Sequence, residues 1–487
     1  MIEPKDAQSG ENNPRVLLLL VCVGLFMVAL ANRAMLVSLP TLTQFFHTSV
    51  AVIQWALLVY DLSVIGLVLT LGRLGDMFGR KTFYVSGFLV FTFGSVLCGL
   101  AQTPGQLIAF RIIQGIGGAM IMAHGRAIIV GSVPATERGK ALGLTSMAFH
   151  IGFLTGPTLG GFVIDSIGWR WVFFINLPIG LAAACLGWKV LAESAKTNKS
   201  GKIDFFGAGY LLLTTSSLVY AMTQLPVRGF THPLVLACLA VFITALLFFV
   251  RTELRTETPI LQLSLFRSRL FSTSNLTLFF VSFTQSSVGL LMVFYLQNLI
   301  GFTPSQMGWI IITNSVVIIL FSPLAGRLSD RFGSRVLCTL GAALIVLGQF
   351  LIASLSLESS LFEMVFPLVL SGLGWAAFNS PNQSAMLGAV PLDQAGAASG
   401  MNVTTARIGS TVGLAISGAI FTYALSNGGL SPAQIASPQS WSTTPEIFLK
   451  SFQYTMHVLN FFGLLAVFFS AVRGTKKQPI SVAKMDG

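Results

Sequence analysis

The sequence predicts an all-α polytopic membrane protein of fourteen transmembrane helices, built as two six-helix pseudo-repeat bundles plus two inserted helices. Hydrophobic residues make up 54% of the 487 residues and charged residues only 9%, against about 25% charged in an ordinary soluble domain. A soluble protein of this length could not cover its surface with so few charges. Two further observations, a series of apolar stretches and an internal repeat, support the same class.

Each apolar stretch is about 20 residues long, the length that a helix needs to cross a bilayer. The fourteen stretches cover residues 15–40, 51–71, 82–101, 106–133, 139–163, 171–191, 203–224, 232–250, 271–299, 304–325, 336–356, 362–389, 397–424 and 451–472. The first follows an acidic leader and continues to Leu39, so we expect a retained span and not a cleaved signal peptide. We find no strand-like alternation and no polar insertion large enough for a soluble enzymatic domain.

The polar segments between these stretches divide the chain. The predicted parts are a cytoplasmic N-terminal tail (1–14), an N-terminal bundle (15–192), inserted helices (203–250), a cytoplasmic linker (251–270), a C-terminal bundle (271–473) and a cytoplasmic C-terminal tail (474–487). Of the 29 Lys and Arg residues, three would lie outside and four within helices, which leaves 22 in cytoplasmic segments. This positive-inside bias explains the net charge of +12 without nucleic-acid binding. We expect a bacterial inner membrane protein.

An internal repeat relates the two predicted bundles. Residues 72–81 and 326–335 match at six of ten positions at an offset of 254. A glycine pattern at 151–161 returns at 408–418 with an offset of 257. The first pair follows the second helix of each set, and the second pair lies on the fifth helix. Parallel repeats with a site at their interface are typical of transporters.

Three motifs, at residues 72–81, 111–118 and 152–161, occur in order and with matching spacing. In these segments and over nearly its whole length the chain resembles the major facilitator superfamily, in its fourteen-helix drug:proton antiporter branch. The branch often carries an acidic residue on helix 1, where this chain has alanine. The resemblance implies a secondary exporter that works by alternating access.

The first motif implies a conformational latch at the inner face. In the family, the aspartate at the position of Asp76 rests against the N-terminus of a helix from the other half, where the helix dipole favours a carboxylate. A solvated, positively charged turn is the alternative reading. The predicted latch residues are Gly72, Asp76, Gly79, Arg80 and, from the repeat, Asp330.

The third motif implies a hinge on helix 5. Glycines four residues apart allow close helix packing, and a proline within a helix removes a backbone hydrogen bond and bends it. Close packing without a hinge is the alternative. The predicted antiporter hinge comprises Gly152, Gly156, Pro157, Gly160 and Gly161.

Asp61 is the only acidic residue that falls in the middle of a predicted span. Desolvation disfavours its charged form, so it could exchange protons near neutral pH. Alternatively, a fixed ion pair with Arg33 on helix 1 would keep it charged. The resemblance adds Arg111 as a second proton-coupling residue. His124 and His150 are weaker candidates for a proton relay.

Other polar residues are candidates for lining a substrate cavity. Arg33 could receive an anionic or zwitterionic substrate. The full set of predicted cavity residues is Arg33, Gln54, Tyr60, Gln285, Asn379 and Gln383.

Three functions remain open. The first is proton-coupled antiport of amphipathic drug-like compounds by a monomeric transport unit. The second keeps the fold but exports an anionic metabolite, siderophore or lipid. The third, a non-transporting receptor or a membrane enzyme, lacks support, because the sequence shows no nucleophile with a base, no metal cluster and no phosphate loop. We therefore expect no enzymatic activity, no metal and no cofactor; the partners would be the substrate, protons and the lipid bilayer.

Overall fold

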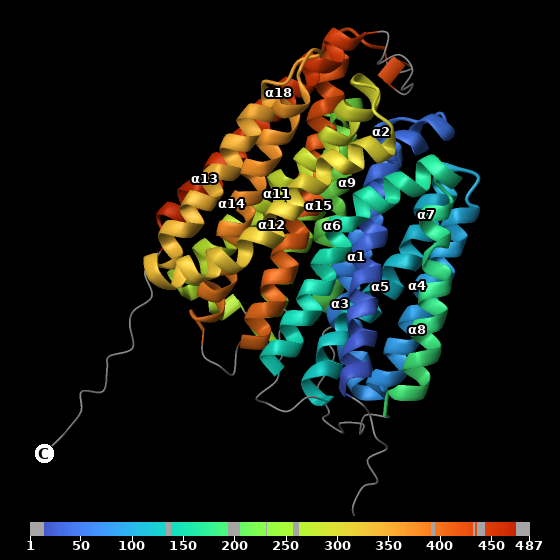
Figure 1. Ribbon diagram of the computed structural model, residues 1–487, viewed down its shortest axis with the longest axis vertical. Coiled ribbons are helices and arrows are strands. Elements are labelled where there is room, and N and C mark those ends of the chain that lie inside the picture. Colours follow the sequence, from blue (N-terminus) through green and yellow to red (C-terminus); the bar gives the residue numbers. More distant parts are fainter. Residues whose placement is uncertain are drawn as a thin grey trace, which may run out of the picture. The chain divides into compact units, whose positions relative to one another are not determined.

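The computed structural model describes residues 14–132, 138–192, 205–229, 231–256, 263–390, 395–431, 434–435 and 444–473, and these residues form helices joined by short connections (Figure 1). No strand occurs among them. The two predicted tails, apart from residue 14, lie outside the described residues. The all-helical class is therefore confirmed.

The helices of the N-terminal set correspond to the first six predicted spans. They are α1 (Pro14–Phe45), α2 (Val50–Ile53), α3 (Trp55–Phe78), α4 (Arg80–Leu100), α5 (Pro104–Ser132), α6 (Arg138–Ile167), α7 (Trp171–Phe174) and α8 (Asn176–Val190). The second span is divided between α2 and α3, and the sixth between α7 and α8. The inserted helices are α9 (Phe205–Arg228) and α10 (Pro233–Arg255).

The C-terminal set is also made of long helices, which correspond to the last six predicted spans. It contains a short 3-10 helix (Leu263–Arg267), α11 (Arg269–Phe294), which continues as a π-helical turn (Tyr295–Leu299), α12 (Pro304–Phe332), α13 (Ser334–Ala353), α14 (Leu361–Leu387), α15 (Ala395–Asn427) and α18 (Pro445–Ala471). Within the described chain, thirteen helical segments have both the length and the hydropathy of a membrane span. α9 has the length but is not among the thirteen.

Two glycines related by the repeat end their helices in the same way. Gly79 has a φ of +115° and Gly333 a φ of +81°, a region that favours glycine. The loops predicted at 72–81 and 326–335 are wrong in extent, because α3 remains helical to Phe78 and α12 to Phe332. Nothing before each glycine breaks the helix, so the chain turns only at the glycine itself.

The fifth helix of each set packs closely on the first. A Cβ at Gly152 of α6 would lie 2.4 Å from the carbonyl oxygen of Phe26 on α1, and a Cβ at Gly409 of α15 would lie 2.5 Å from that of Phe279 on α11. In both cases the missing side chain lets two backbones touch. The repeat therefore extends from sequence to helix packing.

Close contacts group the chain into two compact units. The first comprises Met1–Ile260, Leu290–Ile312 and Gly418–Ser451, and the second Leu261–Gly289, Thr313–Ser417 and Phe452–Gly487. The end of α11, the beginning of α12 and the end of α15 thus pack with the N-terminal helices.

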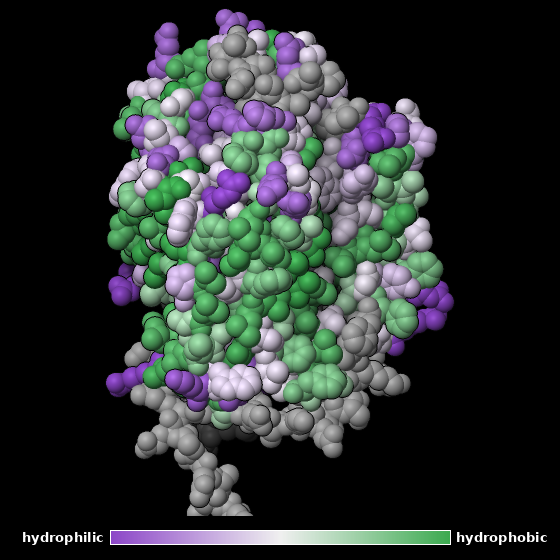
Figure 2. Space-filling model, turned by 90° about the vertical axis from the view of Figure 1, so that its right-hand side faces the viewer, coloured by the Kyte–Doolittle hydropathy of each residue, from purple (hydrophilic) through white to green (hydrophobic). Residues whose placement is uncertain are grey.

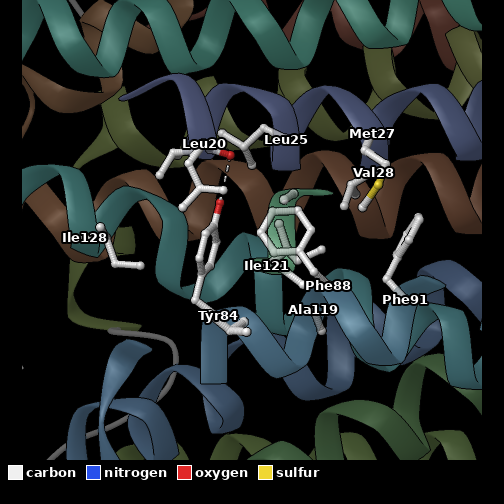
Figure 3. Close-up of a cluster of buried hydrophobic side chains, with 14 of the residues drawn as sticks. Leu20, Leu25, Met27, Val28, Tyr84, Phe88, Phe91, Ala119, Ile121 and Ile128 are labelled. Carbon is white, nitrogen blue, oxygen red and sulfur yellow. Dashed lines mark hydrogen bonds between the residues drawn. The ribbon is translucent and has the colours of Figure 1, made fainter. Parts of the chain in front are cut away.

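A buried apolar cluster joins α1, α4 and α5 in the first unit (Figure 3). Leu25, Phe88 and Ile121 are at most 2% exposed, and Tyr84 donates a 3.5 Å hydrogen bond to the carbonyl oxygen of Leu20 across the cluster (Figure 3). This dense packing holds α1 against its neighbours, which positions the polar residues described below.

Many large apolar side chains are exposed on the surface of the described chain. Figure 2 shows hydrophobic side chains over much of the visible face. Large side chains such as Trp188, Phe206 and Trp309 are between 64% and 75% exposed. Such a surface would aggregate in water and is suited to lipid.

Candidate functional site

Asp61 lies on α3, almost fully buried at 9% exposure. The Nδ2 atom of Asn32 on α1 donates a hydrogen bond of 3.1 Å to its Oδ1 atom. A buried carboxylate needs such donors, since it has lost those of water. This bond between α1 and α3 was not predicted from the sequence.

Arg111 on α5 is completely buried beside the same part of α3. Its Nε donates to the carbonyl oxygen of Ala56 at 2.8 Å, and its Nη1 donates to Oε1 of Gln114 at 2.6 Å. Its guanidinium carbon lies 4.3 Å from the ring centroid of Tyr60, an arrangement in which the ring face attracts the cation. The remaining Nη2 has no hydrogen-bond partner among the described atoms.

Asp61 directly follows Tyr60 on α3, and the ring of Tyr60 contacts the guanidinium of Arg111. The two residues predicted for proton coupling therefore lie on helices that meet at Tyr60. Their role in proton coupling stays a prediction.

Two residues that were not predicted for this site, Ser95 and Asn176, extend the hydrogen bonds of Arg111 through Gln114. Gln114 donates to the hydroxyl of Ser95 on α4 at 3.0 Å, and Asn176 of α8 donates to the same hydroxyl at 3.1 Å. Ser95 in turn donates to the carbonyl oxygen of Phe173 at 2.9 Å. Asn176 stands in the Asn-x-Pro segment after the fifth helix, while Ser95 carries no sequence signal.

Arg33 is half-buried on α1 and turns toward α6. Its guanidinium carbon lies 3.4 Å from the ring centroid of Phe153. Gly156 makes the approach possible, because a Cβ there would lie 2.5 Å from the Cβ of Arg33. An arginine stacked on an aromatic ring presents a flat, positively charged surface. The alternative of a fixed Arg33–Asp61 pair stays a prediction.

The other predicted cavity residues occupy different environments. Gln54 is buried, and a Cβ at Gly418 would lie 2.2 Å from its Oε1 atom. In the second unit, Gln285 on α11 and Asn379 on α14 are half-buried, and Gln383, one turn beyond Asn379, is exposed. Their role in substrate binding stays a prediction.

The predicted hinge residues of α6 face two different neighbours. Gly152, Gly156 and Gly160 pack on α1, as a Cβ at each would lie within 2.4–2.8 Å of its atoms. Gly161 instead lies against the start of α12, where its Cβ would be 2.2 Å from the carbonyl oxygen of Pro304. Pro157 is inside α6.

Further contacts join α6 to the start of α12. Thr158 donates to the carbonyl oxygen of Gly308 at 3.0 Å. The Oδ2 of Asp165 accepts the backbone N–H of Ser305 at 2.8 Å, in the first turn of α12. A carboxylate there satisfies an N–H that the helix leaves unpaired and complements the helix dipole.

The predicted latch lies where α3 meets the end of α5. The ring of His124 fills the space beside Gly75, and its Nδ1 lies 2.8 Å from the carbonyl oxygen of Met120. Arg80 donates to the carbonyl oxygen of Ala127 at 3.4 Å. Gly72 and Gly79 belong to the same stretch, whereas the side chains of Asp76 and Asp330 lie outside the described residues.

The described chain contains no group of three His, Cys, Asp or Glu side chains that could hold a metal ion.

Comparison with known proteins gives matches over most of the chain. The family model described as Major Facilitator Superfamily matches residues 21–268 and 275–480. The riboflavin transporter RibZ of Clostridioides difficile (strain 630) is 32% identical over 413 residues, which cover 84% of this chain and 89% of that protein. Multidrug resistance protein Stp of Mycobacterium tuberculosis (strain CDC 1551 / Oshkosh) is 33% identical over 405 residues, covering 83% and 75%.

Another relative and two solved structures extend the comparison. The tetracenomycin C resistance and export protein of Streptomyces glaucescens is 28% identical over 85% of this chain and 77% of that protein. The inward-facing, unoccupied structure of a bacterial homolog of the human lysosomal transporter Spinster has a TM-score of 0.69 at 16% identity, covering 96% of this chain and 97% of that chain. The POT family transporter PepTSo has a TM-score of 0.65 at 15% identity, covering 94% and 97%. These structures share the fold.

Proposed function

This chain belongs to the Major Facilitator Superfamily of membrane transporters, and from that premise we propose that it is a proton-coupled exporter of amphipathic, drug-like compounds. Relatives named for multidrug resistance and for tetracenomycin C export support an export role. The observation that carries proton coupling is the buried carboxyl of Asp61, which is hydrogen-bonded to Asn32 and directly follows Tyr60, the residue against which the buried Arg111 packs.

In the proposed cycle, a proton and a cationic substrate bind to Asp61 in turn. A proton arriving from outside neutralises Asp61, which ends its attraction to Arg111 and weakens its bond to Asn32. Loss of the charge releases a cationic substrate outward. The helices then rearrange, Asp61 releases its proton to the cytoplasm, and the site accepts the next substrate by alternating access. We place this monomeric unit in a bacterial inner membrane with both termini in the cytoplasm, as the distribution of basic residues favours.

The test uses purified full-length protein in liposomes with an imposed pH gradient. The wild type should move a fluorescent aromatic cation such as ethidium against its gradient. Asp61→Asn should lose gradient-driven accumulation while retaining downhill exchange, because the amide cannot carry the proton. Ser63→Ala is the matched control, since the Ser63 hydroxyl only donates to the carbonyl oxygen of Val59 on the same helix. Gradient-driven transport by Asp61→Asn would contradict the role of Asp61.

A second candidate is transport of an anionic or electron-rich planar compound. It is favoured by the half-buried guanidinium of Arg33, stacked on Phe153, and by the relative named as a riboflavin transporter. The same liposome assay should therefore also be run with riboflavin and with an amphipathic organic anion as test solutes. If only these move and Arg33→Gln stops them, Arg33 is the recognition residue and the cation is not the substrate. Absence of movement of every solute would favour a non-transporting receptor.

A further inference from the structure

The side chain of Asn32 is hydrogen-bonded to Asp61. This residue lies on α1 between Ala31, which is 3% exposed, and Arg33. The bond of 3.1 Å spans 29 residues of sequence and joins α1 to α3. Asn32 is not part of the three motifs discussed above, and nothing in its local sequence marks it as a functional residue.

The chemistry of an amide makes Asn32 a sensor of the charge on Asp61. An N–H donor bonds a carboxylate about twice as strongly as it bonds a neutral carboxylic acid. The bond therefore favours the deprotonated state of Asp61. When the carboxyl is protonated, the amide can turn over and accept its proton through the amide oxygen, so one side chain can serve both states.

The charged and titratable groups near Asp61 come from three helices. Arg111 on α5 directs its Nε and Nη1 to Ala56 and Gln114. Arg33 on α1 holds its guanidinium over Phe153. Tyr60 on α3 lies under the guanidinium of Arg111.

The position of Asn32 connects the carboxyl to the predicted hinge. Asn32 is adjacent in sequence to Arg33, and the Cβ of Arg33 is the atom nearest to the missing side chain of Gly156 on α6. A change in the bond between α1 and α3 therefore reaches the α1–α6 contact within one residue.

We propose that Asn32 is a positioning residue that sets the proton affinity of Asp61 and transmits its protonation state from α3 to α1. This rests on the proposed function, in which Asp61 carries the coupled proton. In the deprotonated state Asn32 ties α1 to α3, and protonation loosens the tie.

The experiment measures ethidium exchange in liposomes at equal pH on both sides, over a series of pH values. The rate should follow a titration midpoint that belongs to Asp61. Asn32→Ala should move that midpoint to higher pH by about one unit, since it removes one hydrogen bond to the charged form. Asn32→Leu, which has the same branching and number of side-chain heavy atoms as asparagine but no donor, should shift the midpoint equally. It provides the test if the alanine variant does not fold. Asn32→Gln, which keeps an amide, should restore most of the wild-type midpoint.

Ser38→Ala is the matched control on α1. The Ser38 hydroxyl is buried and donates to the carbonyl oxygen of Ala34 on its own helix, so its loss should leave the midpoint unchanged. A second readout, the protons released when ethidium binds to the detergent-solubilised protein, should show the same shift without any transport step.

The outcomes separate the two proposals. A midpoint that persists in Asp61→Asn would overturn both, because Asn32 acts only through Asp61. A midpoint that disappears in Asp61→Asn but stays in place in Asn32→Ala and Asn32→Leu would overturn the role of Asn32 alone. In the Asp61→Asn background, Asn32→Ala should cause no additional change in the pH profile.

Discussion

Gly75 illustrates how one residue governs the contact between α3 and α5. A Cβ at this position would lie 1.8 Å from Nε2 of His124, well inside van der Waals contact. His124 is 1% exposed, so its ring has little room to move away. Gly72, three residues earlier in the same motif, is different, since its Cβ would meet only the Cβ of Ala123 at 3.7 Å. The motif thus contains one glycine required by packing and one with space beside it.

Gly75→Ala should therefore destabilise the protein by about 1–3 kcal/mol, the usual cost of overpacking, and lower its thermal unfolding temperature in detergent. Gly72→Ala should stay within about 0.5 kcal/mol of the wild type. The double variant Gly75→Ala with His124→Ala should recover part of the loss, because the clashing ring is gone. Equal unfolding temperatures for the two single variants would show that His124 does not fill this space.

The glycines of α6 determine how closely this helix packs on α1. Its close contact with α1 runs from Gly152 through Gly156 to Gly160 and meets the backbone of Phe26 and the Cβ atoms of Arg33 and Ala34. Such a contact has little side-chain bulk to interlock, so two helices can shift along it more easily than along a seam of large side chains. Pro157 lies in the middle of this stretch, where it interrupts the backbone hydrogen bonding of α6. Both features suit a helix that moves during transport.

Gly152→Ala should separate α6 from α1, because its Cβ would lie 2.4 Å from the carbonyl oxygen of Phe26, a backbone atom that cannot rotate aside. We expect roughly 1–3 kcal/mol of destabilisation and a smaller folded fraction by size-exclusion chromatography. Gly105→Ala is the control, since nothing lies within 4 Å of the position of its Cβ. A Gly152→Ala variant as stable as Gly105→Ala would mean that the α1–α6 contact adapts freely.

At the scale of the whole molecule, the repeat produces two matched contacts within the first unit. Gly161 of α6 lies against Pro304 at the start of α12, and Gly418 of α15 lies against Gln54 between α2 and α3. In each case the last glycine of the fifth helix meets the second helix of the other set. These contacts, with the bond from Ser305 to Asp165, join the two sets at the predicted outer end of the helices. In the proposed alternating-access cycle these contacts would open once in each cycle.

A disulfide across this contact should stop transport. In a background without the five native cysteines, Asp165→Cys with Ser305→Cys should cross-link under oxidation, because the Oδ2 of Asp165 lies 2.8 Å from the backbone nitrogen of Ser305. Ethidium transport should fall to the level of empty liposomes and return on reduction. Ser166→Cys with Ser305→Cys is the control, since the Ser166 hydroxyl bonds to Phe162 on its own helix. Full transport by the cross-linked protein would show that this contact stays closed throughout the cycle.

Some of the site could be predicted from the sequence, because charges inside apolar helices are costly and therefore conspicuous. Asp61 was found in this way, and Arg111 was found through the resemblance of its motif to the superfamily. Asn32 and Ser95 were not, because small polar residues are common in membrane helices and their partners depend on how each helix is rotated against the next. The ends of α3 and α12 were missed for a related reason: the length rule marks where a helix leaves the bilayer, and both helices continue beyond that point to a glycine.

By itself the sequence determined the membrane class, the all-helical fold, the two related sets of helices and the superfamily, because hydropathy and repeat spacing are properties of the chain alone. Only the tertiary structure decided which polar groups meet: that Asn32 bonds Asp61, that Arg111 lies over Tyr60, and that Gly161 faces α12 while Gly152 and Gly156 face α1. The physical reason is that these contacts join residues from 29 to more than 140 positions apart, and their geometry follows from the packing of helices and not from local preference.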